Sequence, residues 1–487
     1  MLKPRLQSKL ARVALGFFCL GLAFTGWGAL SHFTGGRSAP PAATKEVRLA
    51  SLSEAKHGGK KTDSLGGSNV LMNDPFMKQH SWGLEKTAAT RAWEITQGSE
   101  DIVVAIIETG VDVNHKDLAD NLWINPGEWG VVENEYCRRQ QNPLSIRECN
   151  KATNGIDDDG NGYIDDVHGW NFVHNNNDLT DNHGHGTHIA GIIGANSKDG
   201  TGVKGVAPKV SIMVLKYFDP KTPNSNTLKN TIEAIRYAIK MKADIINYSG
   251  GGTEYSAEEY EAIKEAERAG ILFVAAAGNE RSNSDEAGKH YYPADYDLTN
   301  IISVTAVNRE ETKVLPSSNY GVRTVDLAAP GENIYSTLPN NSYGLMTGTS
   351  QATAFVTGVA VLIKALNPEF SASDIKKYIL RTGDEYPTLL SKTGTAKLLN
   401  SYRALTSFDM GVSVTGVVAT NTAKLKPDTF AAGRDLNQIR FDTSALKNGE
   451  TSDDAAGDAE SIALFGRDFM KALEASAGST AEARNRP

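Results

Sequence analysis

Cysteine is scarce in this chain of 487 residues, with only three in total, and basic residues are outnumbered by acidic ones. The 50 Lys and Arg against 58 Asp and Glu give a formal net charge of −8. A general nucleic-acid binder needs a basic face, so we expect no nucleic-acid partner. Hydrophobic runs of membrane-spanning length are missing except near the N-terminus, which excludes a polytopic membrane protein. The 46 glycines have no fixed period, which excludes a collagen-like chain.

The N-terminal residues 1–30 have the pattern of an export segment. Four basic residues in 1–12 precede an uncharged, apolar run over 13–30. This order predicts a signal peptide or, since no clean cleavage site is visible, an uncleaved N-terminal anchor. A buried helix of a cytosolic protein is the alternative that the basic flank disfavours. We expect an exported protein (secreted, periplasmic or at the cell surface), monomeric, touching a membrane only through this segment.

Two cysteines remain beyond that segment, Cys137 and Cys149, at the ends of a polar stretch. An exported chain meets an oxidising compartment, so we predict a disulfide between them. The alternative is a pair of free, buried thiols.

The rest of the chain divides by composition into three parts. Residues 31–71 are rich in Ser, Gly, Ala and Lys, which indicates a pro-segment or linker. Residues 72–405 carry regular apolar patterns typical of a packed domain. Residues 406–487 are rich in Ala, Asp, Ser, Thr and Gly, and we expect a largely disordered, low-complexity tail.

Within 72–405, short continuous apolar runs alternate with segments of helical spacing. The predicted strands are 102–107, 210–218, 243–249, 271–279 and 300–307. The predicted helices are 188–195, 231–242, 256–269 and 352–366, the third starting with a capping box formed by Ser256 and Glu259. Apolar strands separated by helices predict an α/β fold with a parallel sheet buried on both faces.

Reactive side chains follow these strands or open these helices. Glu108 ends the first strand, Asn279 follows another, and His185 and Ser350 each stand at the start of a helix. Parallel sheets bind ligands at the carboxyl ends of their strands, so we expect these residues to meet. A serine hydroxyl needs a base, and the base needs a carboxylate to orient it and to stabilise its charge. An amide such as that of Asn279 can stabilise an oxyanion.

Four stretches resemble, in order, the motifs of subtilisin-like serine peptidases: VVAIIETGVDVNHKDL, NHGHGTHIAGIIGA, FVAAAGNE and TGTSQATAFVTGVA. The resemblance implies a three-layer subtilisin-like fold, with a mostly parallel central sheet flanked by helices. It also implies a serine endopeptidase acting on peptides or proteins. Ser350 would then be the nucleophile, His185 the general base and Asn279 an oxyanion donor.

The same resemblance assigns a substrate-binding strand and a specificity pocket. Ser249, Gly250 and Gly251 resemble the segment that pairs with the substrate backbone, and residues 275–278 resemble a wall of the first specificity pocket. The small side chains of that wall suggest room for a sizeable residue. His183 and His188, beside His185, are expected to be structural.

Glu108 departs from the family pattern, in which aspartate occupies this position. The extra methylene would displace the carboxylate by about 1–1.5 Å, and a 1 Å misplacement can cost 10²-fold in rate. Three interpretations stay open at this point. The protein is active with a Glu–His–Ser triad, or Glu108 inactivates a natural site, or Glu108 was introduced by design. The second interpretation implies a pseudopeptidase that binds peptides or proteins without cleaving them.

An acidic loop, NGIDDDGNGYIDD (154–166), resembles the start of a calcium loop. Asp157, Asp159 and Asn161 supply alternate oxygen ligands, a glycine follows at the sixth place, and Asp165 falls at the ninth. We therefore predict a structural calcium ion here, with a solvated acidic loop as the alternative. A second cation site is considered at Asp117 and the loop 196–203.

Overall fold

The computed structural model describes residues 80–198, 200–222 and 225–407. The chain divides into two units, Met1–Val70 and Leu71–Pro487, and all described residues belong to the second. The predicted export segment (1–30) and the pro-segment or linker (31–71) lie outside the described residues, as does nearly all of the predicted tail (406–487).

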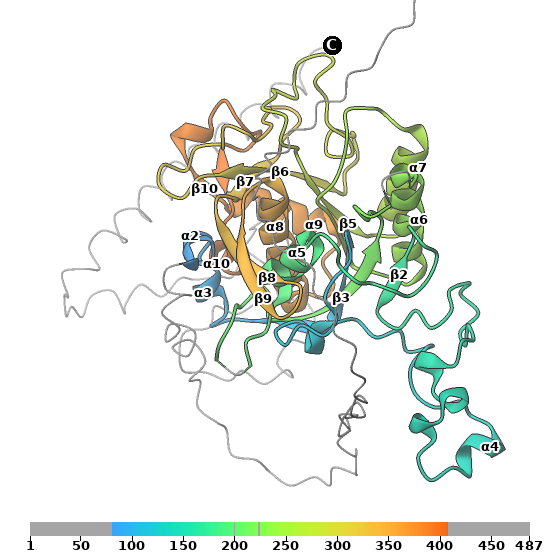
Figure 1. Ribbon diagram of the computed structural model, residues 1–487. Helices are drawn as coiled ribbons and strands as arrows, with labels where there is room; N and C mark the ends of the chain where they lie inside the picture. The colour runs from blue at the N-terminus through green and yellow to red at the C-terminus, as the bar shows by residue number, and fades with distance from the viewer. Residues whose placement is uncertain (1–79, 199, 223–224, 408–487) are drawn as a thin grey trace, which may run out of the picture. The chain divides into compact units, whose positions relative to one another are not determined.

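A nine-stranded sheet forms the centre of the described unit (Figure 1). Its strands lie in the order β10-β11-β7-β6-β5-β4-β1-β3-β2, and every neighbouring pair is parallel except β10 with β11. The strands span β1 Gly98–Glu108, β2 Gly169–Asn171, β3 Lys209–Lys216, β4 Ile245–Tyr248, β5 Leu272–Ala276, β6 Ile301–Val307, β7 Leu327–Pro330, β10 Asp384–Glu385 and β11 Lys397–Leu398. This confirms the predicted α/β class and the mostly parallel central sheet.

The sheet is buried on both faces because its strands carry apolar residues at consecutive positions. In β1, Val104 and Ile106 belong to one hydrophobic core, whereas Ala105 and Ile107 belong to a second core on the opposite face. Successive side chains of a strand point to opposite faces, so a continuous apolar run supplies both cores.

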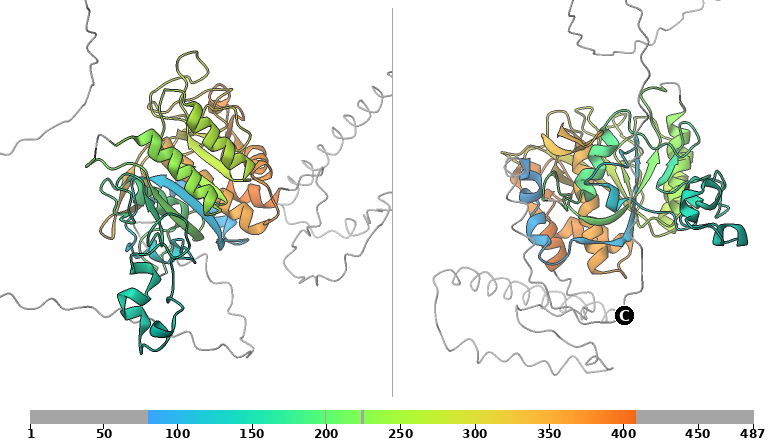
Figure 2. Two further views of the ribbon diagram at one scale, coloured as in Figure 1. Left: turned by 90° about the vertical axis from the view of Figure 1, so that its right-hand side faces the viewer. Right: turned by 60° about the horizontal axis from the view of Figure 1, so that its bottom comes forward.

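Helices cover each face (Figure 2). Helices α6 (Thr227–Lys240) and α7 (Ala257–Arg268) pack side by side over one face. Helices α5 (His185–Gly194), α8 (Thr349–Leu366) and α9 (Ala372–Thr382) cover the other. Among the described residues α8 alone has the length and hydropathy of a membrane span, and 83% of it is buried inside the fold. It therefore serves as the central core helix, against β1 and β4 to β7.

Smaller elements complete the unit. Helices α2 (Trp82–Lys86), α3 (Ala89–Ala92) and α10 (Ser401–Thr406) bring the two ends of the described segment together, since α10 contacts both α3 and α8. Strands β8 (Ile334–Leu338) and β9 (Ser342–Met346) form a separate antiparallel hairpin that packs on α5.

The predicted capping box at the start of α7 is only half formed. Ser256 caps the helix by accepting a hydrogen bond from the backbone N–H of Glu259. The carboxylate of Glu259, however, accepts from the hydroxyl of Tyr296 at 2.9 Å rather than from the N-cap backbone. A tertiary contact replaces the local one here because Glu259 is buried.

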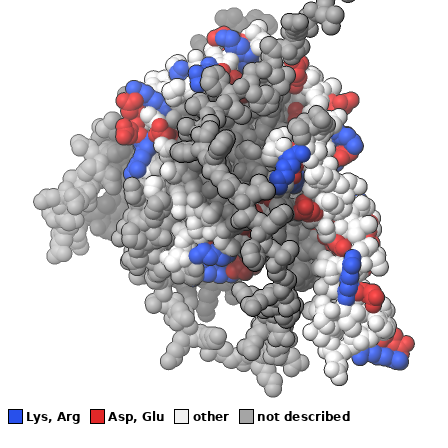
Figure 3. All heavy atoms as spheres, viewed as in Figure 1, with Lys and Arg blue, Asp and Glu red and all other residues white. Residues whose placement is uncertain are grey.

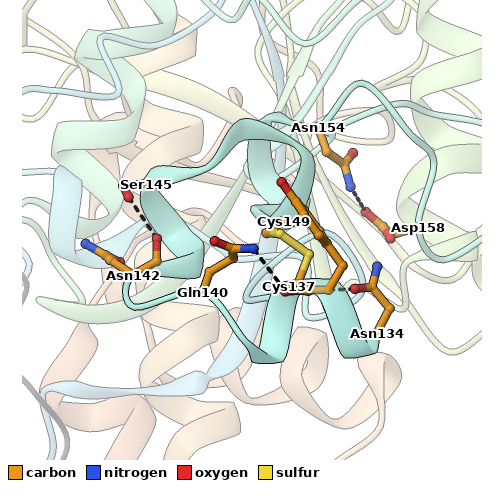
Figure 4. The surroundings of a disulfide bond; sticks show 9 residues. Asn134, Cys137, Gln140, Asn142, Ser145, Cys149, Asn154 and Asp158 are labelled. Carbon is orange, nitrogen blue, oxygen red and sulfur yellow. Dashed lines mark hydrogen bonds between the residues drawn. A yellow bond between two sulfur atoms is a disulfide. The ribbon is translucent and has the colours of Figure 1, made fainter.

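A polar insertion around α4 (Glu135–Arg138) lies away from the sheet and is fastened by the predicted disulfide (Figure 4). Cys137 and Cys149 are bonded, with their Cα atoms 5.5 Å apart, and both are buried. The alternative of two free thiols is wrong.

Charges of both signs are mixed on the surface. Exposed ion pairs such as Arg138–Glu133 lie on the insertion. In Figure 3, basic and acidic side chains are interspersed over the described part of the visible face.

We expect Leu362→Ala to lower the free energy of unfolding by about 2–5 kcal/mol, because Leu362 is fully buried in α8 and its removal leaves a cavity. Leu366→Ala, at a 39% exposed position of the same helix, is the matched control and should cost about 0.5 kcal/mol. Urea titration in a Ser350→Ala background, which prevents self-digestion, measures both. Equal losses in the two variants would contradict the central role of α8.

Candidate active site

The site lies where the sheet order reverses around β1. This strand pairs with β3 on one side and with β4 on the other. The long helix that follows β1, α5, lies on one face of the sheet, whereas the helix that follows the neighbouring strand β4, α7, lies on the opposite face. Such a switch point opens a crevice at the carboxyl edge of a parallel sheet. Glu108 is the last residue of β1, and the segments after β4 and β5 reach the same edge.

Glu108 and His185 form the hydrogen-bonded pair at this edge. The Nδ1 atom of His185, the first residue of α5, lies 2.8 Å from Oε2 of Glu108. The Glu108 side chain is 2% exposed and that of His185 is 22% exposed, so the imidazole alone faces the crevice. The longer side chain of glutamate therefore still meets the ring.

Glycine at position 186 makes the approach of α5 to β1 feasible. A Cβ at Gly186 would lie 2.9 Å from the Cβ of Glu108, closer than real Cβ atoms approach other heavy atoms. A larger residue would push His185 away from the carboxylate.

The surroundings raise the pKa of His185. Burial alone would lower this pKa, but the charge of Glu108 and the hydrogen bond to it outweigh burial, with a smaller contribution from Asp181. A raised pKa makes the imidazole a stronger base, which suits proton abstraction from a hydroxyl.

Ser350 stands in the first turn of α8, at the amino end of the helix. Its side chain is nearly buried, and Oγ donates to the carbonyl oxygen of Ser249 at 3.1 Å. The first N–H groups of a helix have no partner within the helix, so the backbone N–H of Ser350 is available to an oxyanion. The sequence analysis did not name this N–H group, although the predicted helix start at Ser350 was the signal for it.

Asn279 lies against the turn that precedes Ser350. Its Oδ1 accepts a hydrogen bond from the backbone N–H of Thr349 at 3.1 Å. With the carbonyl oxygen fixed in this way, the Nδ2 group is the donor that Asn279 can offer beside the nucleophile. The structure therefore brings Glu108, His185, Asn279 and the segment with Ser350 to one edge of the sheet.

A buried carboxylate that the sequence analysis missed holds the loop before His185. Asp181 accepts hydrogen bonds from the hydroxyls of Thr109 and Thr187, at 2.8 and 2.7 Å, and from three backbone N–H groups of this loop and of α5. The Thr109 hydroxyl in turn accepts from the N–H of Gly186 at 2.9 Å. Asp181 thus ties the end of β1 to the start of α5. Only its position four residues before His185 could have suggested this role.

Comparisons with known proteins all point to one family. The family model "Subtilase family" (Peptidase_S8) matches residues 99–404. Thermitase of Thermoactinomyces vulgaris is 34% identical over 336 residues, covering 68% of this chain and 98% of that protein. The major intracellular serine protease of Bacillus subtilis is 34% identical, covering 59% and 76%. Subtilisin-like protease 1 of Plasmodium berghei is 32% identical, and the match spans about half of it, 53%.

The chain belongs to the subtilase family. The predicted family and the predicted class of serine-type endopeptidase are thereby confirmed.

The other histidine on α5 is structural in this subtilase. His188 is fully buried, and its Nε2 lies 3.0 Å from the carbonyl oxygen of Ile334 in β8. Burial lowers the pKa of His188 to about 4, so the ring is neutral and donates to that carbonyl. It fastens α5 to the β8–β9 hairpin, outside the reacting set.

The acidic loop converges on a different set of carboxylates from the predicted one. Ligand atoms of Glu128, Asp159 and Asp166 all lie within 4.8 Å of one another. Glu128 is fully buried, and its Oε2 has no hydrogen-bond partner among the described residues. Burial raises the pKa of Glu128 to about 7. Carboxylate oxygens are the ligands that a hard divalent cation prefers, and these three carboxylates with an unpartnered buried oxygen would supply part of its coordination shell.

Of the four residues predicted as ligands, only Asp159 belongs to this group. Asp157 accepts from the backbone N–H groups of Asn161 and Gly162, at 3.0 and 2.7 Å, and Asp165 accepts from that of Gly155. Asn161 lies beside the group and donates its amide to Asp166 at 2.9 Å. The periodic pattern therefore shapes the turn, whereas Glu128 comes from a preceding segment.

The second site considered, at Asp117, has a carboxylate that is already engaged. Oδ2 of Asp117 accepts from the backbone N–H of Val203 and from the hydroxyl of Tyr343, both at 2.9 Å. The loop 196–203 does contact Asp117, but through backbone hydrogen bonds.

We expect the reactivity of Ser350 towards a fluorophosphonate to fall as pH drops through the raised pKa of His185, because only the neutral imidazole accepts a proton. The half-maximal pH should lie above about 6.5, the ordinary histidine value. In Glu108→Gln the raising charge is gone while burial remains, so the midpoint should move down. The pH dependence of the inactivation rate measures this, with the exposed Glu94→Gln as control. An unmoved midpoint in Glu108→Gln would mean that the two side chains are not paired.

Proposed function

We propose that the protein is an exported serine endopeptidase whose nucleophile is Ser350, with His185 as general base and Glu108 as the carboxylate of the triad. The observation that carries this proposal is the 2.8 Å hydrogen bond between Glu108 and His185 at the switch point of the sheet. It supports a working triad because a carboxylate on Nδ1 fixes the tautomer that leaves Nε2 as the base.

The reaction begins when Oγ of Ser350 attacks the carbonyl carbon of a peptide bond. Nε2 of His185 takes the hydroxyl proton, and Glu108 stabilises the imidazolium that results. The oxyanion accepts hydrogen bonds from Nδ2 of Asn279 and from the backbone N–H of Ser350. His185 then gives its proton to the leaving amine, which leaves an acyl group on Ser350. Water, activated by His185, releases the acid and restores the serine.

An extended peptide is the substrate form that the surroundings favour. Ser249, Gly250 and Gly251 follow β4 directly, and the carbonyl oxygen of Ser249 is already a hydrogen-bond partner of Ser350. A substrate strand that pairs with this segment would bring its scissile carbonyl to the nucleophile. Ser249 itself is braced by Asn247, whose amide donates to its hydroxyl at 3.1 Å.

The buried disulfide supports export, since such bonds persist in oxidising compartments. Structural calcium is part of the same proposal, held by Glu128, Asp159 and Asp166 rather than by the loop pattern alone. The ion would neutralise three converging carboxylates and join the segment around Glu128 to the acidic loop. It would take no part in bond cleavage.

A pseudopeptidase that binds peptides or proteins is the second candidate, and one observation favours it. Oε1 of Glu108 is buried without a hydrogen-bond partner among the described residues. An unsatisfied carboxylate oxygen is a cost of about 1–3 kcal/mol, or more for a charged group. A scaffold that only binds peptides can tolerate this cost, whereas the same cost would weaken a working triad. The unpartnered oxygen therefore favours the pseudopeptidase.

Labelling with a fluorophosphonate probe separates the two candidates. We expect the parent protein to be labelled and Ser350→Ala to be blank, because the probe reacts only with an activated serine. Glu108→Gln should react about 10⁴-fold more slowly, since the imidazole loses its orienting charge. Glu108→Asp should slow by up to about 10²-fold, because the shorter side chain retreats from Nδ1. An unlabelled parent together with a labelled Glu108→Asp would establish the pseudopeptidase instead.

Calcium should raise the melting temperature of the Ser350→Ala protein, and chelation should lower it, because unneutralised carboxylates repel one another. We expect Glu128→Gln to abolish this calcium dependence, since it removes the buried ligand. Asp157→Asn should keep it, since Asp157 lies outside the group of converging carboxylates and binds backbone N–H groups of its own loop. Thermal unfolding with and without calcium measures the effect. If Asp157→Asn abolishes the calcium dependence and Glu128→Gln keeps it, the ligand set predicted from the loop is supported instead. If the melting temperature depends on calcium in neither the Ser350→Ala protein nor the variants, the acidic loop is solvated and binds no calcium.

A further inference from the structure

The expected first specificity pocket lies between two segments that leave neighbouring strands. Residues 249–252 follow β4 and residues 277–279 follow β5, and these strands are paired in parallel with Tyr248 opposite Ala275. The side chains of residues 275–278 are small, which was the reason to expect room for a sizeable substrate residue beside the segment 249–251 that is expected to pair with the substrate backbone. A third segment, however, enters the space between them.

The ring of Tyr291 lies between the glycines of the two walls. A Cβ on Gly251 would lie 2.6 Å from Cε1 and 3.0 Å from Cζ of Tyr291. A Cβ on Gly278 would lie 2.8 Å from Cδ2 of the same ring. One aromatic ring therefore contacts both walls, and glycine is needed on each side to make room for it.

The backbone around Tyr291 is fixed to one wall. Tyr292 and Gly252 exchange two backbone hydrogen bonds of 2.7 and 2.9 Å, as in an antiparallel bridge. The N–H of Tyr291 donates to the carboxylate of Asp295 at 3.0 Å, and its carbonyl oxygen accepts from the N–H of Asp295 at 3.0 Å. Burial also raises the pKa of the Tyr291 hydroxyl, together with the charges of Glu280 and Glu259. These hydrogen bonds fix the segment around Tyr291 and so hold its ring between the two walls.

We infer that Tyr291 closes the first specificity pocket, so that this subtilase accepts a small residue (Gly, Ala or Ser) on the acyl side of the cleaved bond. The inference rests on the proposed function and deepens it by naming the substrate class. A large side chain at that substrate position would need the volume that the ring of Tyr291 already fills. The small side chains of the walls leave a space, but the ring of Tyr291 occupies it.

Hydrolysis of a series of N-acyl tetrapeptide anilides tests this, with three fixed residues and Ala, Leu or Phe before the scissile bond. We expect kcat/KM of the parent to be at least about tenfold higher for Ala than for Phe. Tyr291→Ala should open the space and shift the Ala-to-Phe ratio towards Phe by about 10–200-fold. Tyr291→Phe should leave the ratio unchanged, because the ring, not its hydroxyl, fills the space.

Tyr255→Ala is the matched control, since Tyr255 is 58% exposed and lies next to Tyr292 but outside the space between the glycines. It should leave the ratio unchanged. Circular dichroism and fluorophosphonate titration establish that each variant is folded and give its active fraction. A parent that cleaves after Phe as fast as after Ala, or a ratio unmoved in Tyr291→Ala, would overturn the inference.

A binding measurement judges the pocket without any chemistry. In Ser350→Ala, fluorescence polarisation compares the affinities of two labelled hexapeptides that differ only by Ala or Phe at the same position. We expect tighter binding of the Ala peptide, and reversal of this order when Tyr291→Ala is added. If the parent is not labelled by the fluorophosphonate, the proposed function fails, and this comparison still decides the inference. Equal affinities in both proteins would overturn it.

Discussion

The position of β1 between β3 and β4 is the constraint on which the rest of the site depends. The helices that follow β1 and its neighbour β4, α5 and α7, lie on opposite faces of the sheet, so the two connections diverge and leave a crevice at the carboxyl ends of these strands. Glu108 ends this strand, and α5 and α8 begin beside it, with His185 and Ser350 in their first turns. The reacting groups thus sit on the ends of rigid elements.

Close packing around this crevice is achieved by small residues and buried carboxylates. Gly186 lets α5 approach the Cβ of Glu108 and the backbone of Gly110, and Asp181 satisfies N–H groups at the start of that helix. On the far side of the same loop, Lys216 and Asp219 form a buried ion pair of 2.8 Å at the end of β3, and Lys216 also donates to the carbonyl oxygen of Thr180. The loop before His185 is thus fixed at both Asp181 and Thr180, and His185 meets Glu108 although glutamate is one methylene longer than the aspartate expected from the motif.

Much of the fold could be predicted because strands that are buried on both faces carry apolar residues at consecutive positions, and such runs are visible in the sequence. The strand predicted at 102–107 is the interior of β1, and the helix predicted at 352–366 is α8 without its first turn. Local hydrogen-bond patterns were less informative. Glu259 was expected to complete a capping box but bonds Tyr296. In the acidic loop, Asp159 lies near Asp166 and near Glu128, which stands outside the predicted pattern. In each case a residue distant in sequence competes with the local partner.

The sequence by itself determined the family and the parallel sheet, and it proposed the four residues of the reacting set, because these follow from residue types in fixed order on strands and helices. Only the tertiary structure decided how they act together. It showed that the carboxylate of Glu108 reaches His185, that Ser350 lies in the first turn of α8, and that the ring of Tyr291 lies against both Gly251 and Gly278. These are distances between segments far apart along the chain, and no local pattern of residues encodes them.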